Sequence, residues 1–243
     1  MRMAPEGRPF LLVGVALTIL LLLAGMVLGA LGPAGASSAW PGSPVFWSRV
    51  LYGGAGVLAL LTAFTLFFFR DPPRTPPEDS RAVVAPGDGL VVQIADVDEP
   101  LYMEGAARRI SIFLSIFDVH VQRAPLSGVV EHRSYKAGGY AMAWKARASE
   151  DNEQASLGMA VGEEKILVRQ IAGFVARRVV TDPEEGDRVE RGDRIGLIRF
   201  GSRVDLVVPP HWEVTCRKGD RARGGETVLA RLPEPPRGEE EEA

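Results

Sequence analysis

Two long runs without a charged residue constrain this chain more than any other feature of its sequence. They extend from Phe10 to Leu31 and from Val50 to Phe69. Each is about as long as the roughly 20 apolar residues that a helix needs to cross the hydrocarbon core of a bilayer. Because the segment between them is short, the two runs predict a hairpin of two transmembrane helices within residues 1–69.

The first run also has an interpretation as a cleaved signal peptide. Arg2 and Arg8 precede it, and the small residues Ala34, Gly35 and Ala36 follow it, as around a cleavage site. The apolar core of a signal peptide usually has only about 7–15 residues, and this comparison favours the hairpin.

The distribution of arginines predicts the orientation of the hairpin. Basic residues are scarce between the two runs, where Arg49 stands alone, and they gather outside them. The flanking arginines are Arg2, Arg8, Arg70, Arg74 and Arg81. The positive-inside rule then places everything after Phe69 on the cytoplasmic face of the cell (inner) membrane. The same arginines also suit contact with anionic lipid.

Beyond the second run the composition becomes that of a soluble domain. We expect a Pro-rich linker over residues 70–82, a β-rich domain over residues 83–232 and an acidic, disordered tail over residues 233–243. The net charge of −3 gives no electrostatic basis for binding nucleic acid. A single cysteine excludes a disulfide framework, and three histidines leave little room for a metal centre.

Short apolar runs separated by Gly-Asp pairs predict strands joined by tight turns. The runs cover residues 90–95, 109–117, 166–180, 194–200 and 204–208, and the pairs are Gly87-Asp88, Gly186-Asp187, Gly192-Asp193 and Gly219-Asp220. Residues 185–193 also resemble residues 218–226, as two hairpin corners of a barrel-sandwich hybrid would. The predicted fold class is mainly β (α+β), a compact barrel-sandwich-like domain preceded by the transmembrane hairpin.

Gly201 and Ser202 lie between two of these apolar runs. A tight turn is the simplest interpretation, because both residue types are common in turns. The dipeptide also permits a reaction, since a serine hydroxyl can attack the unhindered carbonyl of a preceding glycine with a large effective molarity. Elimination from the resulting ester yields an N-terminal pyruvoyl group, which forms Schiff bases and accepts electrons.

Six motifs occur in a fixed order around this dipeptide. They are FFRDPPRTP at 68–76, APGDG at 85–89, FDVHVQRAPLSG at 117–128, YKAGG at 135–139, ASEDNE at 148–153 and FGSR at 200–203. In order and spacing they resemble the phosphatidylserine decarboxylase proenzymes of the short bacterial and archaeal type. The resemblance extends from about residue 67 to residue 232, and a two-span hairpin before the first motif is also typical of that family.

The resemblance implies a lyase of phospholipid biosynthesis that converts phosphatidylserine in the membrane to phosphatidylethanolamine and CO2. It implies self-cleavage of a zymogen between Gly201 and Ser202, giving a β chain of residues 1–201 and an α chain of residues 202–243. The two chains would form a heterodimer, with room for a further oligomer. The cofactor of the implied enzyme would be a pyruvoyl group made from Ser202, and the enzyme would need no metal.

The same resemblance assigns roles to two further residues. Asp88 matches the aspartate of an Asp-His-Ser relay for self-cleavage, although its local sequence is also that of a turn in which aspartate bonds its own backbone. His120 matches the motif's histidine, a residue suited to proton transfer near neutral pH. The long bacterial type has a second histidine where this chain has Arg123. His120 therefore either serves both reactions or the relay differs.

Arg123 suits the substrate's phosphate or carboxylate, and a solvated strand arginine is the other interpretation. Lys136, Asn152 and Glu153 fall in matching motifs without an assignable role. His132 and His211 have no motif support, so we interpret both as structural or solvated.

A non-enzymatic, membrane-anchored barrel-sandwich binding module, similar to a transport adaptor, is the alternative function. The repeated hairpin has no lysine at its tip, so the chain is not a lipoyl carrier. A zinc peptidase with a similar β core needs a His-x-x-x-Asp and a His-x-His pair, and the sequence contains neither. Self-cleavage before Ser202 separates the enzyme from the adaptor.

Overall fold

The computed structural model describes residues 2–32, 41–139, 152–173, 178–199 and 202–234. The chain divides into two compact units, Met1–Asp71 and Pro72–Ala243, and each is described by itself. The first unit is helical and the second consists mainly of β-strands, as the sequence predicts.

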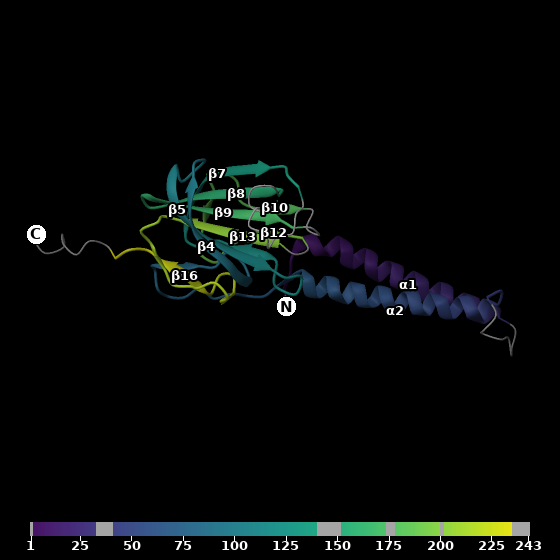
Figure 1. The fold of residues 1–243 in the computed structure, drawn as a ribbon. Coiled ribbons are helices and arrows are strands. Elements are labelled where there is room, and N and C mark those ends of the chain that lie inside the picture. The colour runs from purple at the N-terminus through teal and green to yellow at the C-terminus, as the bar shows by residue number, and fades with distance from the viewer. Residues whose placement is uncertain (1, 33–40, 140–151, 174–177, 200–201, 235–243) are drawn as a thin grey trace, which may run out of the picture. The chain divides into compact units, whose positions relative to one another are not determined.

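The first unit contains two long helices, α1 (Arg8–Leu31) and α2 (Pro44–Phe68), which lie side by side (Figure 1). The helical turn η1 (Pro5–Gly7) precedes α1, and the short strands β1 (Arg2–Met3) and β2 (Arg70–Asp71) pair with each other. Both long helices have the length and apolar composition to cross a membrane. The two uncharged runs are therefore confirmed as helices.

Small residues let the two helices approach closely. A Cβ atom at Gly25 of α1 would lie 2.9 Å from Cε1 of Tyr52, and one at Gly14 would collide with Thr62 of α2. Helix α2 begins before its uncharged run because Ser43 caps it, its hydroxyl accepting the Phe46 N–H, and Pro44 occupies the first turn.

The second unit is built from fourteen described strands. They are β3 (Ala82–Val84), β4 (Gly89–Glu99), β5 (Gly105–Leu114), β6 (Val121–Arg123), β7 (Gly128–Lys136), β8 (Gln154–Val161), β9 (Glu164–Ala172), β10 (Val179–Thr181), β11 (Arg188–Val189), β12 (Arg194–Ile198), β13 (Ser202–Val208), β14 (Glu213–Val214), β15 (Arg221–Ala222) and β16 (Val228–Arg231). The predicted run 166–180 divides into β9 and β10. Strand β5 ends at Leu114, earlier than predicted, because the Asp118 carboxylate accepts the Ser115 N–H and turns the chain.

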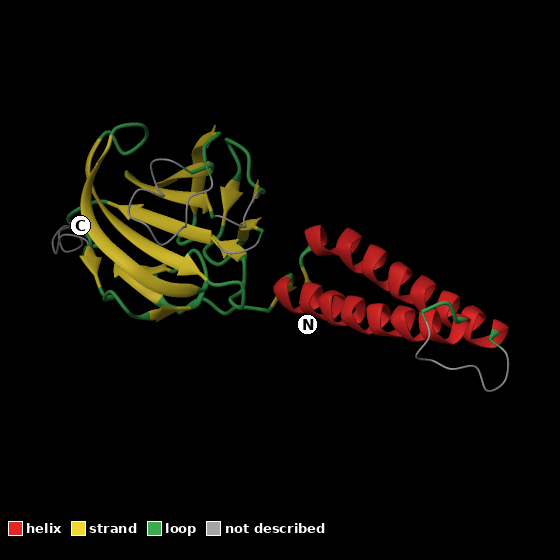
Figure 2. Cartoon of the chain, turned by 45° about the vertical axis from the view of Figure 1, so that its right-hand side comes forward, coloured by secondary structure: helices red, strands yellow, loops and turns green. Residues whose placement is uncertain are grey.

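Eight of these strands form one curled antiparallel sheet in the order β11-β7-β8-β9-β13-β5-β4-β15 (Figure 2). Two three-stranded sheets, β10-β12-β6 and β14-β16-β3, complete the unit. Strand β13 comes late in the sequence but pairs with β9 on one side and β5 on the other (Figure 1). The strand that begins at Ser202 is therefore central in the large sheet.

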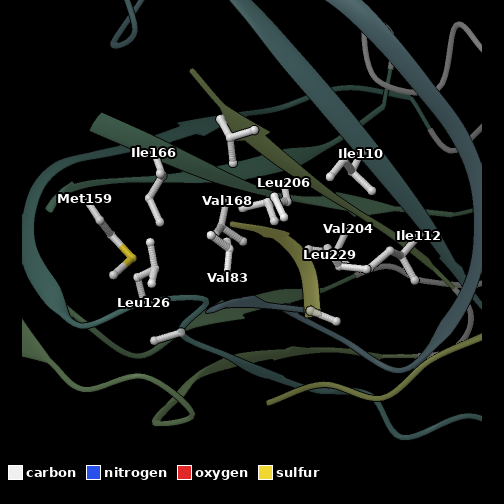
Figure 3. Close-up of a cluster of buried hydrophobic side chains, with 14 of the residues drawn as sticks. Val83, Ile110, Ile112, Leu126, Met159, Ile166, Val168, Val204, Leu206 and Leu229 are labelled. Atoms are coloured by element: carbon white, nitrogen blue, oxygen red, sulfur yellow. The ribbon is translucent and has the colours of Figure 1, made fainter. Parts of the chain in front are cut away.

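The curled sheet encloses the main hydrophobic core (Figure 3). Val204, Leu206 and Val208 of β13 point into this core because alternate residues of a strand face the same side. They pack with Ile110 and Ile112 of β5, and all five side chains are fully buried. Ser202 has the same parity as these core residues and begins the inward face of β13.

Three of the four predicted Gly-Asp turns share one construction. The glycines Gly186, Gly192 and Gly219 have φ angles of 94°, 91° and 99°, which favour glycine. In each turn the following aspartate carboxylate accepts a backbone N–H three residues earlier, from Glu184, Glu190 or Arg217, at 2.7–2.9 Å. Each glycine N–H donates to a strand carbonyl, of Val130, Ala124 or Val91. The repetition inferred from sequence is thus a repeated turn.

The proline-rich residues 72–77 are bonded to the β-rich unit along their length. Arg123 donates to the Pro72 carbonyl at 3.1 Å, and Arg191 donates to the Pro77 carbonyl at 2.7 Å. The Arg74 side chain is only 8% exposed and forms ion pairs with Asp88 and Glu226. Its guanidinium is therefore not available for lipid contact, contrary to the expectation from its position after the second run.

Candidate active site around Ser202

Ser202 begins β13 and is completely buried. Leu114 of β5 and Ala172 of β9 are its strand partners. Its hydroxyl has no hydrogen-bond partner among the described residues. A buried hydroxyl without a partner is destabilising by about 1–3 kcal/mol, so such a group calls for a functional explanation. Gly201, the predicted partner in self-cleavage, lies outside the described residues.

Asn152 supports the strand beside Ser202. Its side-chain amide is fully buried and donates to the carbonyl of Ala172 at 2.7 Å, and the Ala172 N–H donates to the carbonyl of Glu153 at 2.8 Å. Asn152 and Glu153, the last two residues of the motif ASEDNE, thus bond to Ala172, the strand partner of Ser202. Sequence reasoning gave Asn152 and Glu153 no role, because their proximity depends on the register of β9 and β13.

Asp88 lies in the bend before β4 and departs from the other Gly-Asp pairs. Its carboxylate accepts two hydrogen bonds from Arg74, at 2.7 and 3.0 Å, and one from the Gly224 N–H at 2.8 Å. It does not cap its own turn. The adjacent Gly87 is close to this end of β13, because a Cβ there would lie 3.2 Å from Val204.

Burial raises the pKa of Asp88, and the nearby Asp118 carboxylate acts in the same direction. The Gly224 N–H and the Arg74 guanidinium oppose this shift without cancelling it. A carboxylate with a raised pKa is a stronger proton acceptor than an exposed aspartate. The described hydrogen bonds of Asp88 go to Arg74 and Gly224 rather than to His120.

His120 is fully buried immediately before β6. Its Nδ1 lies 3.0 Å from the carbonyl oxygen of Asp118. A carbonyl oxygen only accepts, so Nδ1 carries the proton in this contact, and Nε2 is the basic nitrogen of the neutral ring. Val121 of β6 pairs with Leu197 of β12, and β12 leads along the chain to Ser202. The sheet therefore brings His120 to the segment that precedes the serine.

Arg123, at the end of β6, has a role in holding neighbouring segments. Its guanidinium donates to the carbonyl of Gly192 at 3.0 Å and to that of Pro72 at 3.1 Å. These contacts join a Gly-Asp turn to the proline-rich segment. The histidines without motif support have local partners, with His132 near Ser134 and His211 near Glu164.

Arg203 and Gln122 are buried polar residues that sequence reasoning did not single out. Arg203 faces away from the core and is 1% exposed, with Nε donating to Asp205 at 2.7 Å and a terminal nitrogen donating to Ser111 at 2.6 Å. Gln122 accepts from Gln170 at 2.6 Å. The charges at alternate positions of an otherwise apolar strand were the available signal for Arg203.

The described residues contain no cluster of three histidine, cysteine, aspartate or glutamate side chains placed to hold a metal ion. What they do contain is an unpartnered serine hydroxyl with a basic histidine nitrogen and a carboxylate of raised pKa in neighbouring segments. Fold and site together define a class: β-rich proteins with two membrane-type helices and a candidate reactive serine at the start of a central strand.

Comparison with known proteins identifies the family within this class. The family model for phosphatidylserine decarboxylase matches residues 61–230. The chain is 54% identical over 179 residues to a phosphatidylserine decarboxylase proenzyme of Salinibacter ruber, covering 72% of this chain and 79% of the relative. It is 42% identical over 232 residues to the proenzyme of Symbiobacterium thermophilum, covering 95% and 96%.

The proenzyme of Saccharopolyspora erythraea is 46% identical over 236 residues, 95% of this chain and 88% of the relative. The last two matches include the helical unit as well as the β-rich unit. The chain therefore belongs to the phosphatidylserine decarboxylase family, as the six motifs predict.

Proposed function

We propose that this protein is a membrane-bound phosphatidylserine decarboxylase that makes its own pyruvoyl group from Ser202. It would convert phosphatidylserine to phosphatidylethanolamine and CO2. One observation carries the proposal within the family: the hydroxyl of Ser202 is buried at the start of β13 and has no hydrogen-bond partner among the described residues. It therefore breaks no hydrogen bond to those residues before it reacts.

Self-cleavage begins with attack of Ser202 Oγ on the carbonyl carbon of Gly201. The new C–O bond replaces the peptide C–N bond, so the chain passes through an ester. His120 Nε2 accepts the hydroxyl proton and returns it to the departing amine. Elimination across Cα and Cβ of residue 202 releases the Gly201 carboxylate, and water then displaces ammonia to leave the pyruvoyl group.

Asp88 is the second acid-base group in this proposal. Its raised pKa suits proton transfer at the elimination step, when the Cα proton of residue 202 must leave. Its present contacts with Arg74 and Gly224 hold the carboxylate in one orientation, and the adjacent Gly87 lies close to Val204 of β13. A direct relay from Asp88 to His120 would require the carboxylate to exchange one of these partners.

The sheet explains how two cleavage products remain one protein. Residues 202–243 would begin with β13, which pairs with β5 and β9, and both of those strands belong to residues 1–201. The Gly224 N–H and Glu226 of the shorter product also contact Asp88 and Arg74 of the longer one. An α/β heterodimer therefore keeps a continuous sheet after the peptide bond is cut.

A pyruvoyl group supplies a carbonyl that condenses with the substrate amine and an electron sink for the bond to the departing carboxylate. The residues that would hold it are those around Ser202: Leu114 and Ala172 flank it, and Asn152 fixes Ala172. In this proposal His120 donates a proton to the product carbon. Arg123 would meet the phosphate or carboxylate by releasing a carbonyl partner.

The two apolar helices support a location of this chemistry at a membrane. The arginine distribution favours the β-rich unit on the cytoplasmic face of the inner membrane. A lipid substrate then lies in the same bilayer that holds the anchor. The membrane-anchored barrel-sandwich module remains the alternative if the chain does not cut itself.

Intact mass spectrometry of the detergent-purified protein tests the proposal. Wild type should give two chains that divide between Gly201 and Ser202, the smaller one lighter by one ammonia than a chain starting with serine. Ser202→Ala should remain whole and inactive. A folded wild-type protein that stays uncut would overturn the mechanism and leave the binding module as the function.

Matched variants test the two assisting residues. Asp88→Asn should slow cleavage strongly, whereas Asp193→Asn, which alters a Gly-Asp turn of the ordinary kind, should leave it near the wild-type rate. His120→Ala should block cleavage, and His211→Ala should not. Equal cleavage in Asp88→Asn and Asp193→Asn would remove Asp88 from the mechanism.

A further inference from the structure

An exposed apolar turn lies directly beside the candidate site. Strand β5 ends at Leu114, the partner of Ser202, and the chain then exposes Ile116 by 39% and Phe117 by 63%. Leu90, on the neighbouring strand β4, is 37% exposed and pairs with Phe113. Single exposed apolar residues are ordinary. Leu90, Ile116 and Phe117 instead lie on adjacent segments next to Ser202, so together they form one apolar surface beside the candidate site.

The turn is held firmly in this conformation. The Asp118 carboxylate accepts the Ser115 N–H at 2.8 Å, and the Asp118 N–H donates to the Ser115 carbonyl at 2.8 Å. The Asp118 carbonyl oxygen also contacts His120 Nδ1. Ile116 and Phe117 therefore project from a hydrogen-bonded turn whose base positions the site histidine.

Basic side chains border the apolar turn. Arg221 of β15 pairs with Leu90, and its guanidinium is 74% exposed while it lies 3.1 Å from the Asp118 carboxylate. The turn before β15, β15 itself and the residue after it contain four exposed basic residues: Arg217, Lys218, Arg221 and Arg223. Against these four positive charges stand Asp118 and Asp220, which leaves an excess of two positive charges.

We propose that Leu90, Ile116 and Phe117, together with these basic residues, form a docking patch for an anionic phospholipid bilayer. Apolar and aromatic side chains bordered by arginine and lysine suit the headgroup region of such a membrane. Docking brings the β5 end, and with it Ser202 and His120, to the level of lipid headgroups. The inference rests on the proposed function only in taking a bilayer lipid as substrate.

Fluorescent labelling of the full-length chain in vesicles tests the docking patch. Ile116→Cys carries an environment-sensitive fluorophore and retains Phe117. Leu101→Cys is the control, because Leu101 is 71% exposed and lies in the turn before β5, at the other end of that strand. Burial raises the pKa of the native Cys216 thiol to about 11, which suppresses its labelling.

The label at position 116 should shift to shorter wavelength and be quenched by lipid-borne quenchers in phosphatidylcholine vesicles that contain phosphatidylglycerol. The shift should be smaller in phosphatidylcholine alone, and the label at position 101 should stay in water in both. A water-exposed label at 116 in both vesicles overturns the proposal. So does a shift that depends on protein density, which would indicate a second copy of the chain.

An activity comparison gives the same surface a functional readout. Phe117→Ser should lower the rate on phosphatidylserine in vesicles by about tenfold, the effect of losing one buried aromatic contact. Its rate on monomeric short-chain phosphatidylserine should match wild type, as should both rates of Leu101→Ser. Equal loss on both substrates would mean that Phe117 acts on the site rather than on the membrane.

The two proposals fail in distinguishable ways. An uncut chain whose label at position 116 enters the bilayer would contradict the proposed function and support the docking patch. A self-cleaved, active enzyme whose label stays in water would do the reverse. Neither readout depends on the other, since the fluorescence shift requires no turnover.

Discussion

The buried polar groups on the two faces of β13 differ in whether their hydrogen bonds are satisfied. On the outer face Arg203 and Asp205 are almost completely buried and bond to each other, and Arg203 also donates to Ser111. On the inner face Ser202 is equally buried, yet its hydroxyl has no partner among the described residues. Burial therefore does not distinguish the serine proposed to react from its neighbours on this strand. The absence of a hydrogen-bond partner among the described residues does.

Physical chemistry explains why both arrangements persist on one strand. A buried ion pair is tolerated when hydrogen bonds satisfy it, and breaking it is strongly destabilising. An unsatisfied hydroxyl is a smaller penalty, of about 1–3 kcal/mol, which the surrounding core can offset. The outer face thus fixes the strand, and the inner face holds the hydroxyl that we propose to react. Four experiments address this contrast, each in full-length Ser202→Ala protein so that the chain stays whole.

Arg203→Met should have the largest effect. It leaves the Asp205 carboxylate buried without its closest partner and should destabilise the β-rich unit by about 3–5 kcal/mol. Denaturant unfolding followed by near-ultraviolet circular dichroism measures the loss. The double variant Arg203→Met/Asp205→Leu should recover part of it. A loss below about 1 kcal/mol would show that the outer face does not fix the strand.

Leu206→Ala should be next, because Leu206 is fully buried between Ile110 and Val168 on the inner face. Truncation of a buried leucine destabilises by about 2–5 kcal/mol through lost transfer energy and a cavity. The same unfolding measurement applies, with exposed Leu101→Ala as the control. Similar values for both leucines would contradict the assignment of the inner face to the core.

Ser111→Ala should have a smaller effect. It removes the hydroxyl that accepts from Arg203 and should cost about 1.5–3 kcal/mol, the range for hydrogen bonds to charged groups. Combined with Arg203→Met, it should add little, because the bond is already lost. Additive losses in that double-mutant cycle would show that Ser111 stabilises the sheet independently of Arg203.

Asp88 should give the smallest effect, as a difference in pH dependence. Because the pKa of Asp88 is raised above its usual 3.8 in the folded chain, the folded state binds this proton more tightly than the unfolded state. The contribution of Asp88 to stability therefore falls as the pH rises from about 3.8 to the folded pKa. Compared with Asp88→Asn, the protein with Asp88 should lose stability across that interval. An opposite slope would mean that Arg74 dominates.

Patterns of neighbouring residues predicted much of the fold. The uncharged runs gave both long helices, since crossing length and apolar composition are local properties. The Gly-Asp pairs gave the turns, because a left-handed glycine followed by a capping aspartate depends on adjacent residues. The ordered motifs gave the family, although Asp88 shows that one of four similar pairs serves a different purpose.

The contacts that build the site depend on strand order and could not be predicted in this way. Nothing local places β13 between β9 and β5, and only that pairing sets Ser202 beside Ala172, whose carbonyl Asn152 bonds. The ion pairs of Arg74 join residues that are far apart in the chain. Because of these ion pairs, the proline-rich residues 72–77, which the sequence predicts to be linker, belong to the β-rich unit.

The sequence by itself determined the two helices, the β-rich character, the turns and the family, because each depends on periodicity, composition or ordered motifs. Tertiary structure alone decided which buried polar groups are satisfied. A hydroxyl or a guanidinium finds its partner on another strand, and strand register is a property of the whole sheet. For that reason Ser202 and Arg203, neighbours in the chain, have opposite environments in the folded protein.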